Sequence, residues 1–237
     1  MIRTAIVLAA GAGTRLGELG KRYSKPMVPL CGRPLIDWVI ERLHAAGIAR
    51  FVIVAHASDA ALQTHASTIG ASLAVQAERR GIADALCCAA PFVSDDPSFL
   101  ACACDSLFPV ADLRRMLDLA AQHVDDAVVA VQTLDASATA ARSAVVRDGD
   151  LVRAIVEKPP AGSSPSNVIS LPLYALPQRL LARAAATAPL RGERYLSTAL
   201  SDDIAAGGQV HWIEFSARLE ITTAADVARV EAALATT

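Results

Sequence analysis

The feature that most constrains the fold is an apolar run, residues 4–10, that ends at once in the glycine-rich turn Gly11-Ala12-Gly13-Thr14-Arg15-Leu16. Such a run predicts a buried strand, and the glycines after it let the backbone turn sharply and present N–H groups to an anion. The spacing GxGxxxG differs from the GxGxxG of dinucleotide-binding folds, and no GK[ST] follows as in a P-loop. The turn therefore predicts a phosphate site of another kind.

Strands and helices alternate after this turn, and their order predicts an α/β fold. Apolar patterns predict strands at 4–10, 51–55, 72–76, 99–104 and 127–133, separated by helices from Pro34 to Gly47 and at 58–67, 82–90 and 110–123. This order favours a mostly parallel sheet with helices on both faces. The later chain predicts a hairpin at 144–147 and 151–156, strands at 168–176 and 210–215, and helices at 178–186, 195–206 and 224–235. We expect one domain, residues 1–237, with halves at about 1–135 and 136–237.

Composition excludes several classes of protein. Hydrophobic residues make up 53% of the chain and the net charge is −2, which excludes disorder. No basic stretch is interleaved with aromatic residues, so we expect no nucleic-acid partner. Neither a leader peptide nor an apolar run of about 18 residues is present, which predicts a soluble cytoplasmic protein without a membrane partner. The oligomeric state stays open, a homo-oligomer included.

Cysteine and histidine give no sign of a metal centre or a nucleophile. The five cysteines form no CxxC pair, so zinc has little support and we interpret them as small buried hydrophobes. The five histidines are scattered singly, and we assign none of them a catalytic role.

Basic residues are concentrated just after the glycine-rich turn. Lys and Arg total 22, and only three of them are lysines: Lys21, Lys25 and Lys158. Five basic residues follow Gly11 within 23 residues, against the single acid Glu18; they are Arg15, Lys21, Arg22, Lys25 and Arg33. This local excess predicts a site for several phosphates.

Three motifs together resemble a known family. The turn GAGTRL is followed by Lys25-Pro26-Met27-Val28-Pro29-Leu30 and by Gly32-Arg33-Pro34-Leu35-Ile36. The composite is similar to the signature of sugar-1-phosphate nucleotidyltransferases, and the resemblance runs over nearly the whole chain. It implies a nucleotidyltransferase-type (Rossmann-like) fold and the reaction of an NTP with a sugar 1-phosphate to give an NDP-sugar and pyrophosphate.

The resemblance also implies roles for the residues that bind the nucleotide. The glycine-rich loop would wrap the nucleotide, and Arg15 and Lys25 would act on the reacting phosphates as catalytic residues. Gln76 would pair with the edge of uracil or thymine, so that UTP or dTTP is favoured, and Gly81 would pack against the nucleoside. The full nucleotide-binding set is Ala10, Gly11, Ala12, Gly13, Thr14, Arg15, Gln76 and Gly81.

Two carboxylates are implied as ligands of Mg²⁺. Asp105 matches the aspartate of the family's GD motif, although Cys104 replaces the glycine. Glu220 stands where the family has a second metal-binding aspartate, in a segment that lacks the family's tryptophan and glycine. Mg²⁺ is ordinarily held by one or two carboxylates together with substrate phosphates.

The remaining implied residues would bind the sugar phosphate. Glu157-Lys158-Pro159 resembles the family's EKP motif, in which Glu binds sugar hydroxyls and Lys approaches the phosphate. Asn167 begins a segment similar to the strand that walls the sugar pocket, and Glu193 matches a later E-x-Y-L motif. Together with Lys25, the sugar-phosphate set is Glu157, Lys158, Asn167 and Glu193.

Two other functions stay open at this point. One is a cytidylyltransferase acting on an alditol, inositol or phosphonate-type phosphate. The other is a catalytically silent regulatory domain that binds a sugar nucleotide, although intact Arg15, Lys25, Asp105 and Lys158 argue against it. The sequence does not define which sugar or base is used.

Overall fold

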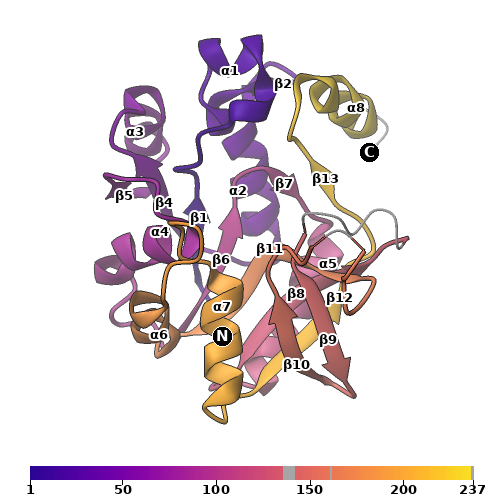
Figure 1. Cartoon of the computed structure of the whole chain (residues 1–237). Helices are drawn as coiled ribbons and strands as arrows, with labels where there is room; N and C mark the ends of the chain where they lie inside the picture. Colours follow the sequence, from indigo (N-terminus) through magenta and orange to yellow (C-terminus); the bar gives the residue numbers. More distant parts are fainter. Residues whose placement is uncertain (136–141, 161, 236–237) are drawn as a thin grey trace.

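A nine-stranded mixed sheet forms the centre of the part of the chain described by the computed structural model, residues 1–135, 142–160 and 162–235 (Figure 1). The strand order is β5-β4-β1-β6-β11-β8-β12-β10-β9. Strands β11 and β10 run opposite to the other seven, so the prediction of a mostly parallel α/β sheet is confirmed. The strands are β1 (Thr4–Leu8), β4 (Arg50–His56), β5 (Ser72–Gln76), β6 (Ser98–Ala103), β8 (Ala127–Thr133), β9 (Ala144–Asp148), β10 (Leu151–Val156), β11 (Val168–Pro177) and β12 (Val210–Glu214).

Helices cover both faces of the sheet and divide the core into two apolar clusters. One cluster takes its helical residues from α2, α3, α5 and α8, and the other from α4, α6 and α7. Strands β1 and β6 contribute alternate residues to the two clusters, as expected for a sheet buried on both faces. The helices are α1 (Glu18–Arg22), α2 (Leu35–Ala46), α3 (Ala60–Thr68), α4 (Ile82–Cys88), α5 (Val110–Gln122), α6 (Leu180–Ala186), α7 (Leu196–Ala205) and α8 (Ala224–Leu234).

Helix ends follow ordinary capping chemistry. Helix α2 stops at Gly47, whose φ of 112° is a left-handed conformation that glycine adopts without a Cβ clash. Helix α8 begins with a capping box in which the Thr223 hydroxyl and the Asp226 carboxylate satisfy each other's backbone N–H groups. These signals explain why the predicted bounds lie close to the observed ones.

Two short sheets and helix α1 were not predicted from the sequence. Strand β2 (Pro29–Leu30) pairs with β3 (Arg33–Pro34), and β7 (Ser106–Leu107) pairs with β13 (Leu219–Glu220). The second pair joins the segment after β6 to the last part of the chain. It therefore brings Glu220 next to the residue that follows Asp105.

The cysteines follow the predicted pattern in part. Cys102 and Cys104 are buried and Cys87 and Cys88 are half-buried, but Cys31 is exposed, which corrects the prediction for that residue. All five are free thiols. Among the described helices, none is both long and apolar enough to span a membrane.

Candidate active site

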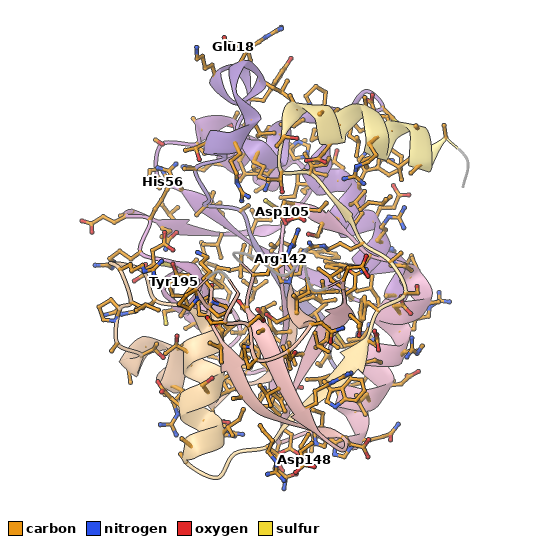
Figure 2. The ribbon with its side chains drawn as sticks, turned by 45° about the vertical axis from the view of Figure 1, so that its right-hand side comes forward. Glu18, His56, Asp105, Arg142, Asp148 and Tyr195 are labelled. Carbon is orange, nitrogen blue, oxygen red and sulfur yellow. The ribbon has the colours of Figure 1, made fainter. Side chains whose placement is uncertain are left out.

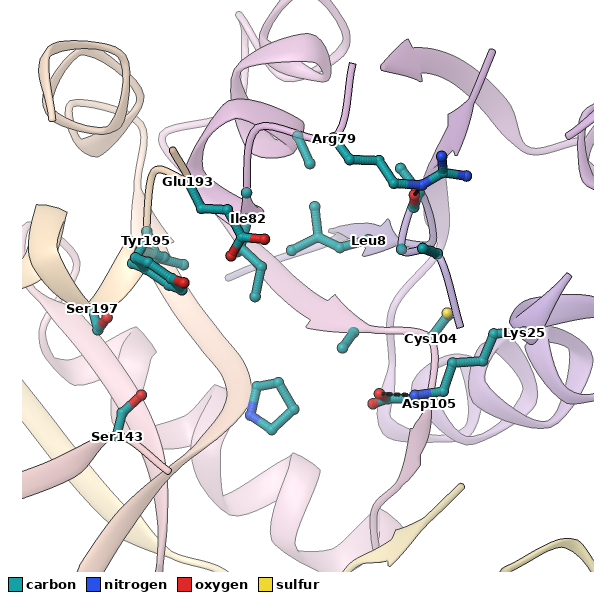
Figure 3. Close-up of a pocket in the computed structure, with 18 of the residues that line it drawn as sticks. Leu8, Lys25, Arg79, Ile82, Cys104, Asp105, Ser143, Glu193, Tyr195 and Ser197 are labelled. Atoms are coloured by element: carbon teal, nitrogen blue, oxygen red, sulfur yellow. Dashed lines mark hydrogen bonds and ion pairs between the residues drawn. The ribbon is translucent and has the colours of Figure 1, made fainter. Parts of the chain in front are cut away.

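A cavity of about 530 Å³ lies where the parallel strands β1, β5 and β6 end, and most of the predicted site residues line it (Figure 3). Open α/β sheets generally bind ligands at this edge. The lining includes Ala10, Gly11, Ala12, Gly13, Thr14, Arg15, Lys25, Gln76, Gly81, Asp105, Glu157, Lys158 and Glu193. Of the residues assigned to the nucleotide, sugar-phosphate and metal sets, Asn167 and Glu220 are outside it.

The glycine-rich loop forms one wall because β1 ends at Leu8 and the chain turns immediately. Gly13 has a φ of 61°, and a Cβ there would lie 3.3 Å from the Lys25 Cβ. Glycine at this position therefore lets the loop lie close to the Lys25 backbone segment. The Arg15 side chain is exposed, and within the described residues it makes no hydrogen bond or ion pair.

Lys25 and Asp105 form the central ion pair of the cavity. Lys25 Nζ donates to Asp105 Oδ2 at 2.5 Å, and their side chains are 12% and 21% exposed. Ser106 Oγ donates to the other oxygen, Asp105 Oδ1, at 2.9 Å. One lysine and one hydroxyl thus orient the carboxylate while it still faces the cavity (Figure 3).

Cys104, which replaces the glycine of the family motif, has an unreactive thiol. Burial, followed by the charge of Asp105, raises the pKa of its thiol to about 12. A thiol in that state is protonated at neutral pH and is a poor nucleophile.

The second half of the chain forms the opposite wall. Glu157 accepts hydrogen bonds from Ser143 Oγ at 2.5 Å and from Ser197 Oγ at 2.6 Å, both to Oε2. Lys158 has a φ of 42°, and its Nζ lies 3.2 Å from Tyr195 Oη and 4.7 Å from the centre of that ring. The carboxylate and the ammonium are therefore held by neighbours that the motif alone did not reveal.

The Gln76 amide is oriented by its own contacts. Its Nε2 donates to Asp84 Oδ2 at 2.9 Å and to the Gly81 carbonyl oxygen at 3.3 Å, which leaves the side-chain oxygen as its remaining polar group. Gly81 has a φ of 98°, and a Cβ there would lie 2.7 Å from the Arg194 backbone nitrogen. The structure thus explains the glycine by its contact with a later loop.

Three of the basic residues that follow the glycine-rich turn lie outside the cavity lining. Lys21 pairs with Glu18 on the exposed surface, Arg33 pairs with Glu41, and Arg22 lies over the Tyr23 ring. Their side chains are directed to local partners, and none of the three lines the cavity. Figure 2 shows Glu18 at one end of the molecule, far from the central Asp105.

Asn167 and Glu220 belong to motifs that resemble the family's site, but neither residue belongs to the cavity lining. Asn167 is exposed just before β11, and its carbonyl oxygen accepts the Leu134 N–H. The Glu220 carboxylate accepts from Arg218 at 2.6 Å and from Arg142 at 3.4 Å, both at Oε2. Neither side chain is a lining group of the cavity.

Several lining residues were missed from the sequence. Arg79 donates to the Ala10 carbonyl oxygen at 3.0 Å and so ties the segment after β5 to the end of β1. Arg142, Ser143 and Ser197 also line the cavity. Isolated serines and arginines form no sequence pattern that predicts a site. For Arg79 the available signal is its position three residues after Gln76.

Comparisons with known proteins agree with this geometry. The chain is 29% identical over 221 residues to the bifunctional protein GlmU of Sorangium cellulosum (strain So ce56), covering 86% of the chain and 46% of that relative. It is 27% identical over 205 residues to a UTP–glucose-1-phosphate uridylyltransferase of Bacillus subtilis (strain 168), covering 73% of the chain and 70% of that relative. The chain thus spans less than half the length of this GlmU.

A solved structure has the same fold at low sequence identity. A UDP-glucose pyrophosphorylase complexed with UDP-glucose superposes with a TM-score of 0.85 at 19% identity, covering 100% of this chain and 99% of the other. The nucleotidyl transferase family profile matches residues 4–215, which contain all the lining residues named above. The resemblance seen in the sequence is thereby confirmed: the chain belongs to the nucleotidyl transferase family.

Proposed function

We propose that the chain transfers a nucleotidyl group from an NTP, with UTP or dTTP preferred, to a sugar 1-phosphate, releasing pyrophosphate and forming an NDP-sugar. One observation carries the proposal: a single cavity joins Arg15, Lys25 and Asp105 on one wall to Glu157 and Lys158 on the other. Cations on both walls suit two phosphorylated substrates that must meet. The relatives named above, whose names include a uridylyltransferase and a UDP-glucose pyrophosphorylase, support the same reaction.

The chemistry requires positioned charge rather than a strong base. A sugar-phosphate oxygen is already an anion when it attacks the α-phosphorus, and negative charge then develops on the departing pyrophosphate. Lys25, held at the centre of the cavity, and Arg15, whose side chain has no competing partner among the described residues, would stabilise that charge. This accounts for a site without a Ser-His or Cys-His arrangement.

The donor set at Asp105 fits a magnesium ion. Its carboxylate faces the cavity with one oxygen on Ser106 and the other on Lys25, and Mg²⁺ commonly takes one or two carboxylates plus substrate phosphates. When bound, the ion would neutralise charge on phosphate oxygens. Glu220 fits less well as a second ligand, because two guanidinium groups already hold its carboxylate.

The orientation of Gln76 supports a preference for uracil or thymine. With Nε2 bound to Asp84 and Gly81, the amide presents an oxygen that can accept a hydrogen bond. Uracil and thymine carry a donor at ring position N3, whereas cytosine carries an acceptor there. CTP would therefore place two acceptors against each other, which costs binding free energy. The cytidylyltransferase alternative has no such supporting contact.

The walls at Glu157 and Lys158 suit a sugar 1-phosphate. A carboxylate fixed by two serine hydroxyls can accept hydrogen bonds from sugar hydroxyls through its free oxygen. The adjacent ammonium of Lys158 would meet the phosphate. We interpret Glu157 and Lys158 as one unit that binds both the sugar hydroxyls and the phosphate of the acceptor.

The test is a matrix of UTP, dTTP, CTP, ATP and GTP against sugar 1-phosphates and alditol, inositol and phosphonate acceptors, followed by pyrophosphate release. We expect turnover with UTP or dTTP and a sugar 1-phosphate. Turnover confined to CTP and an alcohol phosphate would replace the proposal with the cytidylyltransferase. Tight binding of a sugar nucleotide without pyrophosphate release in any cell of the matrix would instead indicate a silent regulatory domain.

A further inference from the structure

Two histidines and an aspartate meet at the end of the sheet opposite the cavity. His123 follows α5, Asp126 precedes β8, and His211 is the second residue of β12. Strands β8 and β12 are parallel neighbours, with His211 in register with Val128. The cluster therefore lies where these strands begin, whereas the cavity lies where the parallel strands end.

The three side chains have the spacing of a metal-binding set. His211 Nε2 lies 3.1 Å from Asp126 Oδ2, and His123 Nδ1 lies 3.8 Å from the same oxygen. One ligand atom from each residue falls within 4.8 Å of the other two. Nitrogen and oxygen ligands at about 2.0–2.2 Å from a tetrahedral zinc ion are roughly 3.3–3.5 Å apart, so zinc binding would draw the three ligand atoms together and turn one of the two stacked imidazoles toward the ion.

An ordinary hydrogen-bonded pair accounts for only part of this arrangement. His211 and Asp126 form such a pair, but His123 Nδ1 is too far from the carboxylate, and its ring has no hydrogen bond to any residue that the structure describes. The two imidazole rings are stacked at 3.7 Å between centres, with 28° between their planes. Among the described residues, the His123 imidazole therefore lies beside the His211–Asp126 pair without a hydrogen bond of its own.

The same chain contains a simpler pair for comparison. His65 Nε2 lies 2.6 Å from Asp37 Oδ1, and within the described residues no second imidazole or cysteine joins that pair. Its geometry is that of a hydrogen bond alone. The two sites therefore differ in that only the first has a second imidazole, that of His123, beside its His–Asp pair.

The surroundings leave room for a cation and its water. A surface hollow of about 520 Å³ is lined by His123, Asp126, Arg179, Gly207 and Gly208, among others. The Arg179 guanidinium is directed to Asp203, at 2.6 Å, and to the Asp125 carbonyl oxygen, at 3.1 Å. The neighbouring positive charge is therefore already engaged, and the glycines add no side chain to the hollow.

We propose that His123, Asp126 and His211 form a binding site for Zn²⁺, with a fourth position open to water from the hollow. Two imidazoles and one carboxylate suit zinc, whereas Mg²⁺ prefers oxygen ligands, so this site is chemically distinct from Asp105. The ion joins the end of α5 to the start of β12. Because such a site is complete only in the folded chain, zinc stabilises the fold when it binds.

The test uses untagged, chelator-stripped full-length protein titrated calorimetrically with Zn²⁺ in excess Mg²⁺. We expect one equivalent to bind and to raise the thermal unfolding midpoint. His123→Ala should weaken zinc binding by at least about tenfold, and the matched variant His65→Ala should bind zinc like the unchanged protein. His123 is the most exposed ligand, so its truncation is the least disruptive.

Co²⁺ provides a second, spectroscopic readout. Tetrahedral coordination by nitrogen and oxygen gives intense visible bands, whereas octahedral coordination by oxygen gives weak ones, and Asp126→Asn should abolish the intense bands. Absence of zinc binding in the unchanged protein would overturn the proposal. Equal zinc affinity in His123→Ala, or only weak octahedral bands with Co²⁺, would overturn it as well.

Discussion

Asp105 directly precedes β7 and Glu220 lies on its partner strand β13, yet the two carboxylates are held in opposite ways. Asp105 pairs with one lysine and faces the cavity, whereas Glu220 accepts from both Arg218 and Arg142 outside the cavity lining. Burial lowers the pKa of Arg218, while Glu220 opposes that shift by raising it. A carboxylate that compensates a buried arginine is costly to withdraw. Two carboxylates that the β7–β13 pairing brings close together thus differ in whether they line the cavity.

Removing the Asp105 carboxylate should have the largest effect. We expect Asp105→Ala to abolish turnover, a loss on the order of 1,000-fold or more, because the cavity loses the carboxylate that fits Mg²⁺ and orients Lys25. Pyrophosphate release at saturating Mg²⁺ measures the loss, and circular dichroism checks that the fold is intact. Near-normal activity of Asp105→Ala would show that the Asp105 carboxylate is not required for turnover.

Lys25 should come next. Lys25→Ala should lower kcat by about 100-fold or more, on the order of 3 kcal/mol of charge stabilisation in the transition state. Lys21→Ala is the matched control, since Lys21 lies on the exposed surface with Glu18 and should leave kcat unchanged. If Lys25→Ala altered only the thermal midpoint, Lys25 would be a structural partner of Asp105 and nothing more.

Glu220 gives the direct test of the comparison. We expect Glu220→Gln to change kcat by less than about threefold and to lower the free energy of unfolding by about 1–3 kcal/mol, because two arginines lose a charged acceptor. Steady-state kinetics over a range of Mg²⁺ and chemical denaturation separate the two effects. A loss of kcat like that of Asp105→Ala, rescued in part by high Mg²⁺, would show that Glu220 is a metal ligand after all.

The sequence predicted the central sheet better than the details of the site. Strands β5 and β8 match their predicted bounds, since apolar runs between helices carry a strong signal. The two-residue strands β7 and β13 have no period to detect, and their pairing decides where Glu220 lies. Motifs identified Glu157, but the serines that hold it come from distant positions. The cluster of His123 with His211 was missed for the same reason.

The segment that carries Glu220 is anchored by Asp226, which provides the smallest expected effect. Burial tends to raise the pKa of Asp226, but hydrogen bonds from Thr223, Arg229 and Thr222 outweigh it and hold the pKa well below its usual value. Arg229 also donates to the Glu220 carbonyl oxygen at 2.9 Å, so this cap supports the backbone beside the arginine-held carboxylate.

We therefore expect Asp226→Asn to lower the free energy of unfolding at pH 7 by about 1 kcal/mol, the usual worth of a helix cap. A depressed carboxyl pKa stabilises the fold above the unfolded value of about 3.9 and loses that contribution as the pH falls. The gap between the unchanged protein and Asp226→Asn should accordingly narrow below about pH 4 in denaturation experiments. Activity should be nearly unchanged, because neither Asp226 nor Thr223 lines the cavity. A constant gap across pH would show that the carboxylate charge contributes nothing to the cap.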